Sequence, residues 1–432
     1  MSQKSFNNEL LEFLSRSPTA FHAVASLSEM LDAAGFTRLH EEDSWQLEAN
    51  QGYYVTRNDS SIIAFRHNAE SMLQQGIRLT GAHTDSPCLK VKPIPEIRRQ
   101  GYLQLGVEVY GGALYAPWFD RDLSLAGRIN YQTRQGELRS CLIDLREPVA
   151  IIPSLAIHLF REVHQGRSIN AQKELMPVLS QLGEKEKFSF DDLLLKQIRK
   201  QSAHRNAAKV LAHELFLYDT QAPAVVGLDG EFIASARLDN LLSCFLACKS
   251  LIAAKGKHAS LLVCNDHEEV GSTSSSGAQG PFLKAVLQRM SQHCGDEPDL
   301  LQRIVSNSAL ISIDNAHGVH PNYLEKHDDK HQPLLNAGPV IKLNANQRYA
   351  SNSESVALFK SICEKARVPY QSFVMRNDMA CGSTIGPITS AETGINTIDI
   401  GVATFAMHSI RELAGAKDAY SLSKVITAFY SR

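Results

Sequence analysis

The chain has 432 residues, of which 44% are hydrophobic and 21% charged, and its formal net charge is -2. A chain of this length exceeds the usual size of one hydrophobic core, so we expect two domains. The near-neutral charge gives no electrostatic reason to expect nucleic acid or a membrane surface as a partner.

The start of the chain lacks the apolar stretch of a secretory signal, and no run of about 18 apolar residues occurs anywhere. The eight cysteines include no Cys-x-x-Cys pair, which is typical of a reducing compartment. We therefore expect a cytoplasmic protein with neither disulfides nor a membrane segment.

The first part of the chain is predicted to supply one packing helix and several strands. Ser17-Pro18 is typical of a helix start and Gly35 of a helix end, with an apolar face between them. Apolar runs at 53–56, 62–65 and 77–82 indicate strands, and the last of these leads directly into His83-Thr84-Asp85.

The middle of the chain, residues 93–237, has a different character, with short β-like pieces and frequent glycine. It separates two segments that resemble halves of one α/β unit, so we interpret it as an inserted, β-rich domain. The predicted division is a catalytic α/β domain made of residues 1–92 and 238–432, interrupted by the insert.

The last part of the chain alternates between strands and helices. Residues 241–254 indicate a buried helix, and further helices are expected at 354–366 and 419–430. Apolar runs of strand length occur at 261–264, 310–313, 340–343, 372–375 and 397–400. The predicted fold class is therefore α/β, with a mixed sheet flanked by helices. In such sheets, sites form beyond the carboxyl ends of the strands.

Several candidate ligands follow these predicted strands or precede the buried helix. Together they offer two imidazoles and several carboxylates, a donor set that can hold two zinc-like ions and leave a position for water. Taken alone, Asp239 is equally well explained as a helix N-cap, and the other residues as structural polar groups. The candidates are His83, Asp85, Asp239, Glu268, Glu269, Asp314 and His408.

Three other features are interpreted as structural. His327 and His331 have the spacing of helical metal ligands, but the acidic and basic residues between them favour a solvated loop. The Gly- and Ser-rich segment 271–277 lacks the Gly-Lys-Ser/Thr ending of a phosphate-binding loop, so we expect no nucleotide. Cys244 and Cys248 lie in an apolar segment and are expected to fill the core.

Five motifs occur in the order found in the aspartyl aminopeptidases of the M18 metallopeptidase family, which the chain resembles over nearly its whole length. They are Gly81-Ala82-His83-Thr84-Asp85-Ser86-Pro87, Leu238-Asp239-Asn240, His267-Glu268-Glu269-Val270-Gly271-Ser272, Ser312-Ile313-Asp314-Asn315-Ala316-His317 and Ala406-Met407-His408-Ser409-Ile410-Arg411-Glu412. Further stretches at 319–323, 338–342, 347–352 and 376–378 also match.

The resemblance implies a role for each candidate. Asp239 would bridge two Zn²⁺ ions, with His83 and Asp314 completing one site and Glu269 and His408 the other. Glu268 would be the general base, and Asp85 would orient the His83 imidazole. Mn²⁺ or Co²⁺ would also suit these ligands.

The resemblance also bears on substrate and assembly. Family members remove an N-terminal Asp or Glu, and Lys342 matches the position that meets the acidic side chain, with Tyr349 and Arg348 close by in the sequence. The insert would be a dimerisation domain within a homododecamer built from dimers. His158 would reach a neighbouring subunit's site, although Ser154 stands where animal members of the family carry a histidine.

The resulting hypothesis is a cytoplasmic, two-zinc aminopeptidase that acts on peptides with a free N-terminus and prefers Asp or Glu there. Two alternatives stay open at this point. The same ligands also serve carboxypeptidases and deacylases, and a catalytically silent peptide-binding scaffold would share the fold.

Overall fold

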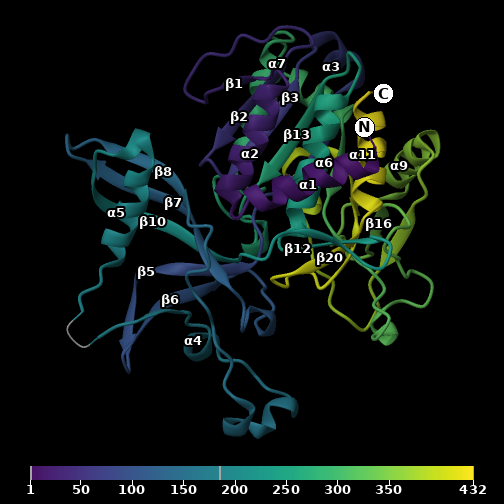
Figure 1. Cartoon of the computed structure of the whole chain (residues 1–432). Coiled ribbons are helices and arrows are strands. Elements are labelled where there is room, and N and C mark those ends of the chain that lie inside the picture. Colours follow the sequence, from purple (N-terminus) through teal and green to yellow (C-terminus); the bar gives the residue numbers. More distant parts are fainter. Residues whose placement is uncertain (1, 184–185, 432) are drawn as a thin grey trace. The chain divides into compact units, whose positions relative to one another are not determined.

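The computed structural model describes residues 2–183 and 186–431, and it divides the chain into two compact units (Figure 1). The larger unit comprises Met1–Ser86, Pro223–Met407 and Glu412–Arg432, and the smaller comprises Pro87–Ala222 and His408–Arg411. The smaller unit thus begins and ends earlier than the insert that the sequence led us to expect over residues 93–237.

The larger unit is built on a nine-stranded mixed sheet, and the fold is α/β as predicted. Each apolar run that predicted a strand belongs to this sheet. In spatial order the strands are β1 (Thr37–Leu39), β2 (Gly52–Arg57), β3 (Ser61–Arg66), β13 (Ser260–Asn265), β4 (Arg78–His83), β14 (Ala309–Ile313), β18 (Asn396–Gly401), β16 (Val340–Leu343) and β17 (Gln371–Val374).

Successive residues of a strand point to opposite faces of the sheet. Both faces of this sheet carry apolar side chains, and helices cover both. Ile62 and Ala64 of β3 belong to the same apolar core as residues of α1 (Gln3–Arg16), α2 (Ala20–Ala33), α6 (Leu238–Ala253), α9 (Ser353–Ala366) and α11 (Asp418–Tyr430). Ile63 and Phe65 face the opposite way, toward α3 (Ala69–Gln75), α7 (Phe282–Gln292) and α8 (Leu300–Ser306). A further helix, α10 (Ile385–Thr393), packs against β18 and β4.

Two details at the start of the chain differ from the sequence-based expectation. The residue that caps α2 is Thr19, whose side chain accepts a hydrogen bond from the His22 backbone, and not Ser17. The preceding helix α1 was not anticipated, although Phe6, Leu10 and Phe13 recur at helical spacing and are buried in the core.

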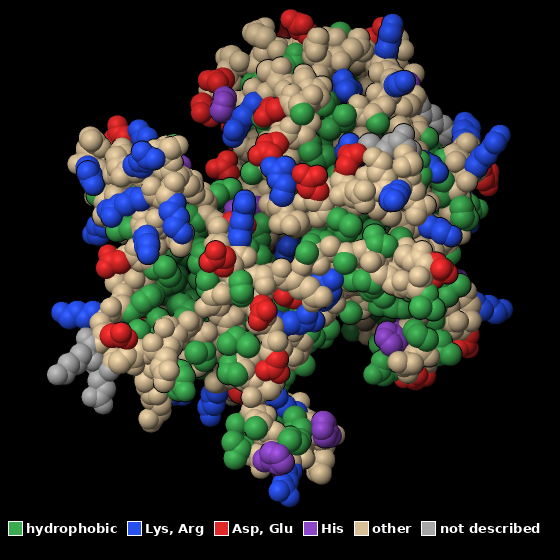
Figure 2. All heavy atoms as spheres, viewed as in Figure 1, with side chains coloured by type: hydrophobic (Ala, Val, Ile, Leu, Met, Phe, Trp, Pro, Cys, Tyr) green, Lys and Arg blue, Asp and Glu red, His purple; other side chains and the backbone are tan. Residues whose placement is uncertain are grey.

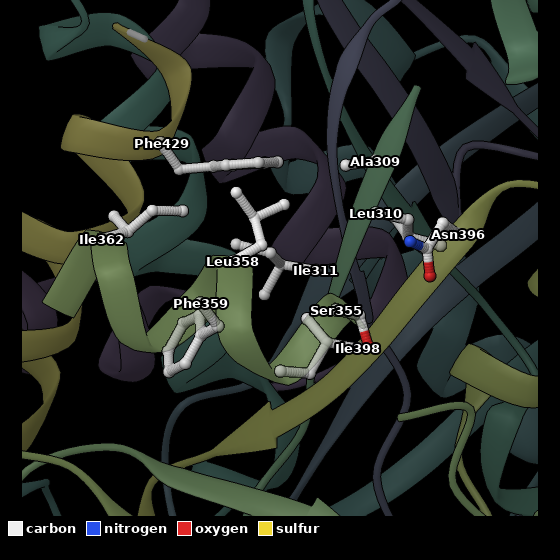
Figure 3. Close-up of a pocket in the computed structure, with 10 residues that line it drawn as sticks. All are labelled: Ala309, Leu310, Ile311, Ser355, Leu358, Phe359, Ile362, Asn396, Ile398 and Phe429. Carbon is white, nitrogen blue, oxygen red and sulfur yellow. The ribbon is translucent and has the colours of Figure 1, made fainter. Parts of the chain in front are cut away.

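Packing on the first face of the sheet is tight. Figure 3 shows Phe359 and Ile362 of α9 and Phe429 of α11 gathered over Ile311 and Ile398 of the sheet. They surround a cavity of only about 10 Å³ with mostly apolar walls, which is about the volume one water needs. This hollow is a feature of the core and offers no groups for chemistry.

A smaller, five-stranded sheet completes the larger unit. Its order is β11 (Ala224–Val226), β12 (Phe232–Ser235), β20 (Glu412–Gly415), β19 (Ala403–Phe405) and β15 (Ala316–His317). Strand β15 begins two residues after Asp314, and the one-turn helix η6 (Leu324–Lys326) follows it in the chain.

The smaller unit has its own sheet and its own apolar core. The strand order is β8 (Leu138–Asp144), β7 (Leu123–Thr133), β10 (Ala207–Asp219), β5 (Cys88–Arg99), β6 (Tyr102–Tyr110) and β9 (Val178–Gln181). Helix α5 (Phe190–Lys200) packs on β10 through Leu194 and Ile198, and α4 (Ala171–Glu174) lies near β6.

The surface charges and the lengths of the helices agree with what the amino-acid composition predicts. On the face that Figure 2 shows, Lys and Arg side chains are interspersed with Asp and Glu, in keeping with the small net charge. Among the residues that the structure describes, no helix is long and apolar enough to cross a membrane.

Candidate active site

Three strands of the large sheet end beside one another and deliver the candidate ligands. Strand β4 pairs in parallel with both β13 and β14. The register sets His83 opposite Asn265, three residues before Glu268, and sets Gly81 opposite Ser312, two residues before Asp314. Because parallel strands end at the same edge of a sheet, these side chains meet there.

The His83 imidazole lies at the centre of the resulting cluster. Its Nε2 is 3.3 Å from Asp239 Oδ1 and 3.6 Å from Asp314 Oδ1, and all three residues are buried. The ligand atoms of this triad lie within 4.8 Å of one another, as do those of His83, Glu268 and Glu269. Two overlapping groups of metal-binding type therefore share one histidine.

Asp239 is held in place through its backbone. Its N–H donates to Glu412 Oε2 at 2.9 Å, and its carbonyl accepts from Ser86 Oγ at 2.7 Å. Arg237, two residues earlier, has the left-handed φ of +60°, a conformation that is uncommon for non-glycine residues and that clusters at functional sites. Glu412 was not among the candidates from the sequence, where its only signal was its place at the end of the 406–412 motif.

Asp85 links two of the motifs that carry ligands. Its Oδ1 and Oδ2 accept hydrogen bonds from the backbone N–H groups of Glu268 and Glu269, both at 3.1 Å. His83 Nδ1 lies 3.1 Å from the Asp85 backbone carbonyl and 3.4 Å from its carboxylate. One buried side chain thus contacts the imidazole and also fixes the turn that carries the paired glutamates.

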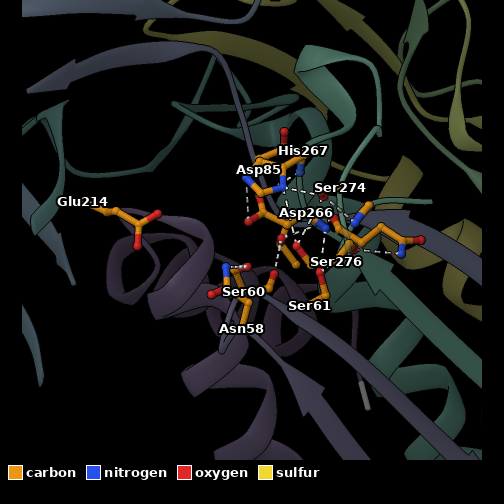
Figure 4. Close-up of polar contacts among 12 residues, drawn as sticks. Asn58, Ser60, Ser61, Asp85, Glu214, Asp266, His267, Ser274 and Ser276 are labelled. Carbon is orange, nitrogen blue, oxygen red and sulfur yellow. Dashed lines mark hydrogen bonds and ion pairs between the residues drawn. The ribbon is translucent and has the colours of Figure 1, made fainter. Parts of the chain in front are cut away.

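A polar network also surrounds Asp266 and His267, which precede this turn, as Figure 4 shows. The Asp266 backbone N–H donates to Ser61 Oγ at 2.8 Å, and the Asp266 carboxylate accepts from the His267 N–H. The His267 ring contacts Ser274 Oγ at 2.8 Å. His267 has a φ of +63° and directly precedes the 3-10 turn η5 (Glu268–Val270). These contacts position the glutamate pair by fixing the backbone before it.

Several carboxylates lie close together in this buried cluster, and they shift the pKa values of the groups around them. Burial lowers the pKa of His83, but the carboxylates of Asp239, Asp314 and Asp85 outweigh burial and raise that pKa well above 6.5. Burial also raises the pKa of Glu268 to about 7 and that of Glu269 well above its usual value, with the neighbouring carboxylates adding to the effect. Carboxylates this close together repel one another, so the cluster favours either protonation of a carboxylate or a bound cation.

The residues fit a divalent cation. Asp314 Oδ1 is buried and accepts no hydrogen bond from the part of the chain that the structure describes, and its 3.6 Å separation from His83 Nε2 exceeds hydrogen-bonding distance. Imidazole nitrogen and carboxylate oxygen are the donors that zinc takes in catalytic sites, where thiolate ligands are often absent. Cys244, the nearby thiol, instead donates from Sγ to the His83 carbonyl at 3.0 Å.

Lys342 lies beside the cluster and is only 2% exposed. Its Nζ donates to Asp314 Oδ2 at 3.2 Å and to the Asn315 carbonyl at 2.9 Å, and it lies 5.2 Å from the centre of the Tyr349 ring. Tyr349 is buried, and burial together with the Cys381 thiol raises the pKa of its hydroxyl. Asp314 therefore uses one oxygen for Lys342 and directs the other toward His83.

Two of the candidates belong to the smaller unit. His408 is half-buried, has a φ of +68°, and its Nδ1 lies 3.2 Å from the Gly112 carbonyl. His158 is exposed in the short 3-10 helix η2 (Ile157–Leu159). Each is described within its own unit, and their roles at the metal centre stay predictions.

The features interpreted as structural make contacts of their own. His331 Nδ1 pairs with Asp328 at 2.6 Å, and His327 Nε2 accepts from the His320 backbone N–H. His327 is buried, so the expectation of a solvated loop at that histidine is wrong. Segment 271–277 forms the turn between η5 and α7, and Cys248 is fully buried in the core.

Comparisons with known proteins identify the family. Residues 13–430 match the family model described as aminopeptidase I zinc metalloprotease (M18). The chain is 57% identical to a probable M18 family aminopeptidase 2 of Pseudomonas fluorescens over 99% of both chains.

Solved structures show the same likeness in three dimensions. The chain superposes with a TM-score of 0.95 and 39% identity on a chain from the cryo-EM structure of the Ape4 and Nbr1 complex, covering 99% of this chain and 86% of that one. The corresponding values for the S. cerevisiae mApe1 dodecamer are 0.86 and 29%, with 99% and 96% covered. The chain therefore belongs to the M18 family of zinc metalloproteases and is an aminopeptidase, a hydrolase of peptide bonds.

Proposed function

We propose that this aminopeptidase uses two Zn²⁺ ions per subunit to remove Asp or Glu from the N-terminus of peptides. The observation that carries the proposal is the buried cluster of His83, Asp239 and Asp314 with Glu268 and Glu269 at the ends of neighbouring strands, beside the ammonium of Lys342. It supplies ligands, a proton acceptor and a cation within one site.

His83 and Asp314 would hold one ion, Glu269 and His408 the other, and Asp239 would offer an oxygen to each. His408 directly follows Met407 of the larger unit in the chain, which limits how far it can lie from that unit. When bound, the two ions lower the pKa of a water and polarise the scissile carbonyl. Asp85 contributes by fixing both the His83 ring and the backbone of Glu268 and Glu269.

Glu268 is the proposed general base. It sits next to a ligand on the turn that Asp85 fixes, and it is not itself required to hold an ion. Its carboxylate would take the proton from the attacking water and pass it to the amine of the departing peptide.

Preference for an acidic first residue would come from Lys342. A nearly buried ammonium favours a carboxylate, because charge-assisted hydrogen bonds are strong where little water competes for them. Tyr349, whose ring faces the ammonium, would form part of the same pocket. Arg348 is exposed, and its Nε donates to the Cys381 carbonyl.

Assembly is the remaining part of the proposal. We propose a homododecamer built from dimers, as the solved yeast relative is described as a dodecamer, with the smaller unit as the dimerisation domain. Around His158 this unit exposes Leu155, Ile157 and Leu159 by 55%, 47% and 74%, and an apolar segment of this kind is typical of an interface. His158 would polarise the scissile carbonyl in a neighbouring subunit.

The test is hydrolysis of peptides that differ only in the first residue, with and without an acetylated N-terminus, before and after chelation and zinc restoration. We expect zinc-dependent release of Asp or Glu well ahead of neutral residues, and none from acetylated peptides. Metal analysis of the active protein should give two ions per subunit. Equal release of all first residues would remove the acidic preference, and one ion at full activity would remove the two-metal scheme.

A further inference from the structure

A second cavity in the larger unit is lined by residues that lie close in sequence to two of the proposed metal ligands. Its volume is about 420 Å³, within the range of pockets that bind small ligands. One wall is β15, which ends with His317, three residues after Asp314. Another wall is Ala406 and Met407, which directly precede His408. The cavity is therefore bounded by the two chain segments that lead to and from proposed metal ligands.

The walls of this cavity, which we call the aromatic pocket, are rich in aromatic and imidazole rings. His320 lies between Tyr323 and Phe405, with ring centres at 4.9 and 5.3 Å. His317 packs edge-on against Phe373 at 5.6 Å. Three methionines complete the lining, and these flexible, polarisable side chains adapt well to aromatic and aliphatic groups.

The imidazoles in the pocket act as neutral rings. His327 Nε2 accepts a hydrogen bond from the His320 backbone N–H, and His320 Nδ1 accepts one from the Asn322 N–H. An accepting nitrogen carries no proton, so neither ring is an imidazolium. Burial, and next the Lys342 ammonium, lower the pKa of His317 from its ordinary value. The one formal charge among the lining residues is Lys326, which is exposed.

The position of the pocket relative to Lys342 indicates what enters it. Three extended residues span roughly 10 Å, so the His317 end of the pocket lies within about that distance of Asp314. Lys342 is not among the lining residues and is already assigned to the first side chain of the substrate. The side chain on the other side of the scissile bond, that of the second residue, is the group left to enter the pocket.

We propose that the aromatic pocket binds the side chain of the substrate's second residue and selects for aromatic or long aliphatic groups there. This inference rests on the proposed function, because it takes Lys342 to bind the first residue. Burial of a large apolar side chain against apolar rings and methionines stabilises the bound substrate. Small side chains leave the pocket unfilled, and Lys326 disfavours Lys or Arg.

The test uses the zinc-loaded, assembled enzyme and peptides Asp-X-Gly-Gly with X as Phe, Leu, Ala, Gly or Lys. We expect kcat/KM for Phe to exceed that for Gly by about tenfold or more, the discrimination typical of an apolar pocket, with Lys the poorest. Release of Asp at the same kcat/KM from all five peptides would overturn this inference and leave the proposed function standing. No release from any of them would overturn both.

Two variants locate the effect. Tyr323→Ala removes an exposed wall of the pocket and should reduce the Phe-to-Gly ratio at least threefold, whereas Leu324→Ala, at a neighbouring residue of equal exposure outside the lining, should not. Lys326→Glu should raise the rate for X as Lys relative to Phe, with the exposed Lys330→Glu as its control. The preference for Asp over Ala at the first residue should stay the same in all four variants. Unchanged second-residue ratios in both Tyr323→Ala and Lys326→Glu would place the preference elsewhere and overturn the inference.

Discussion

Replacing Asp85 by Asn tests whether one carboxylate supports both a metal ligand and the paired glutamates. The amide has nearly the same shape, but it has only one accepting oxygen. It can therefore satisfy only one of the backbone N–H groups of Glu268 and Glu269, both of which Asp85 now accepts at 3.1 Å. Its NH₂ group would face the other N–H.

The expected size of the effect follows from these contacts. Hydrogen bonds to a charged group contribute about 1.5–3 kcal/mol, and Asp85→Asn loses one such bond and weakens the other. The loss is about 2–4 kcal/mol, shared between folding and the site, and every 1.4 kcal/mol is tenfold. We expect the zinc affinity or kcat/KM to fall by about 10–100-fold, as is typical when a residue that orients a ligand is changed.

The assay measures zinc dissociation by competition with a chelator, and kcat/KM at saturating zinc. Asp266→Asn is the matched control, because Asp266 is also buried next to the turn but bonds the His267 N–H and not the glutamates. Burial, and next the Asp85 carboxylate, raise the pKa of Asp266 to about 6, so a neutral amide is a close substitute there. Equal effects of the two variants, or unchanged zinc affinity and rate in Asp85→Asn, would refute the reasoning.

Three further changes test other parts of the site and fold. Glu268→Gln should leave two zinc ions bound while lowering kcat by at least about 10³-fold, measured by metal analysis and turnover; retained turnover would remove Glu268 as the base. Lys342→Met should reduce kcat/KM for Asp peptides by about 100-fold and for Ala peptides far less; an equal loss on both would assign Lys342 to holding Asp314. Burial lowers the pKa of His67 from 6.5 to about 4, so the unfolded chain binds its proton first, and stability should fall as the pH drops from about 6.5 to 4, by up to about 3 kcal/mol. In urea unfolding at pH 7.5 and 5, His67→Phe should lose less stability than wild type, whereas exposed His164→Gln should match wild type.

The sheet of the larger unit was predictable from sequence because its central strands are buried on both faces. Such strands appear as continuous apolar runs, as at 261–264 and 310–313, and their ends mark where polar residues emerge. Helix α1 was missed although both of its signals were visible: Ser2 caps its start, and its apolar residues recur at helical spacing. The start of α2 was misplaced because Ser17 and Thr19 are both good caps, and only the structure shows which side chain reaches a backbone N–H.

The contacts around the site were harder to predict, because they join residues far apart in the chain. Glu412 bonds the backbone of Asp239, and Lys342 bonds Asp314. Neither pairing leaves a periodic signal in the sequence. Asp85 was expected to orient a histidine two residues away, which is a local relation, whereas its bonds to Glu268 and Glu269 depend on how β4 and β13 pair.

These long-range contacts share one design. Asp85, Asp266 and Glu412 each use a buried carboxylate to hold backbone N–H groups of the proposed ligands or of residues next to them. A ligand fixed through its backbone keeps its side-chain oxygens available for a cation, whereas a side chain fixed by direct hydrogen bonds would lose those lone pairs. The supporting carboxylates also add negative charge to a site that already holds several carboxyl groups. In the proposed scheme, bound ions would offset that charge, so the same residues that order the site would also make it depend on the ions.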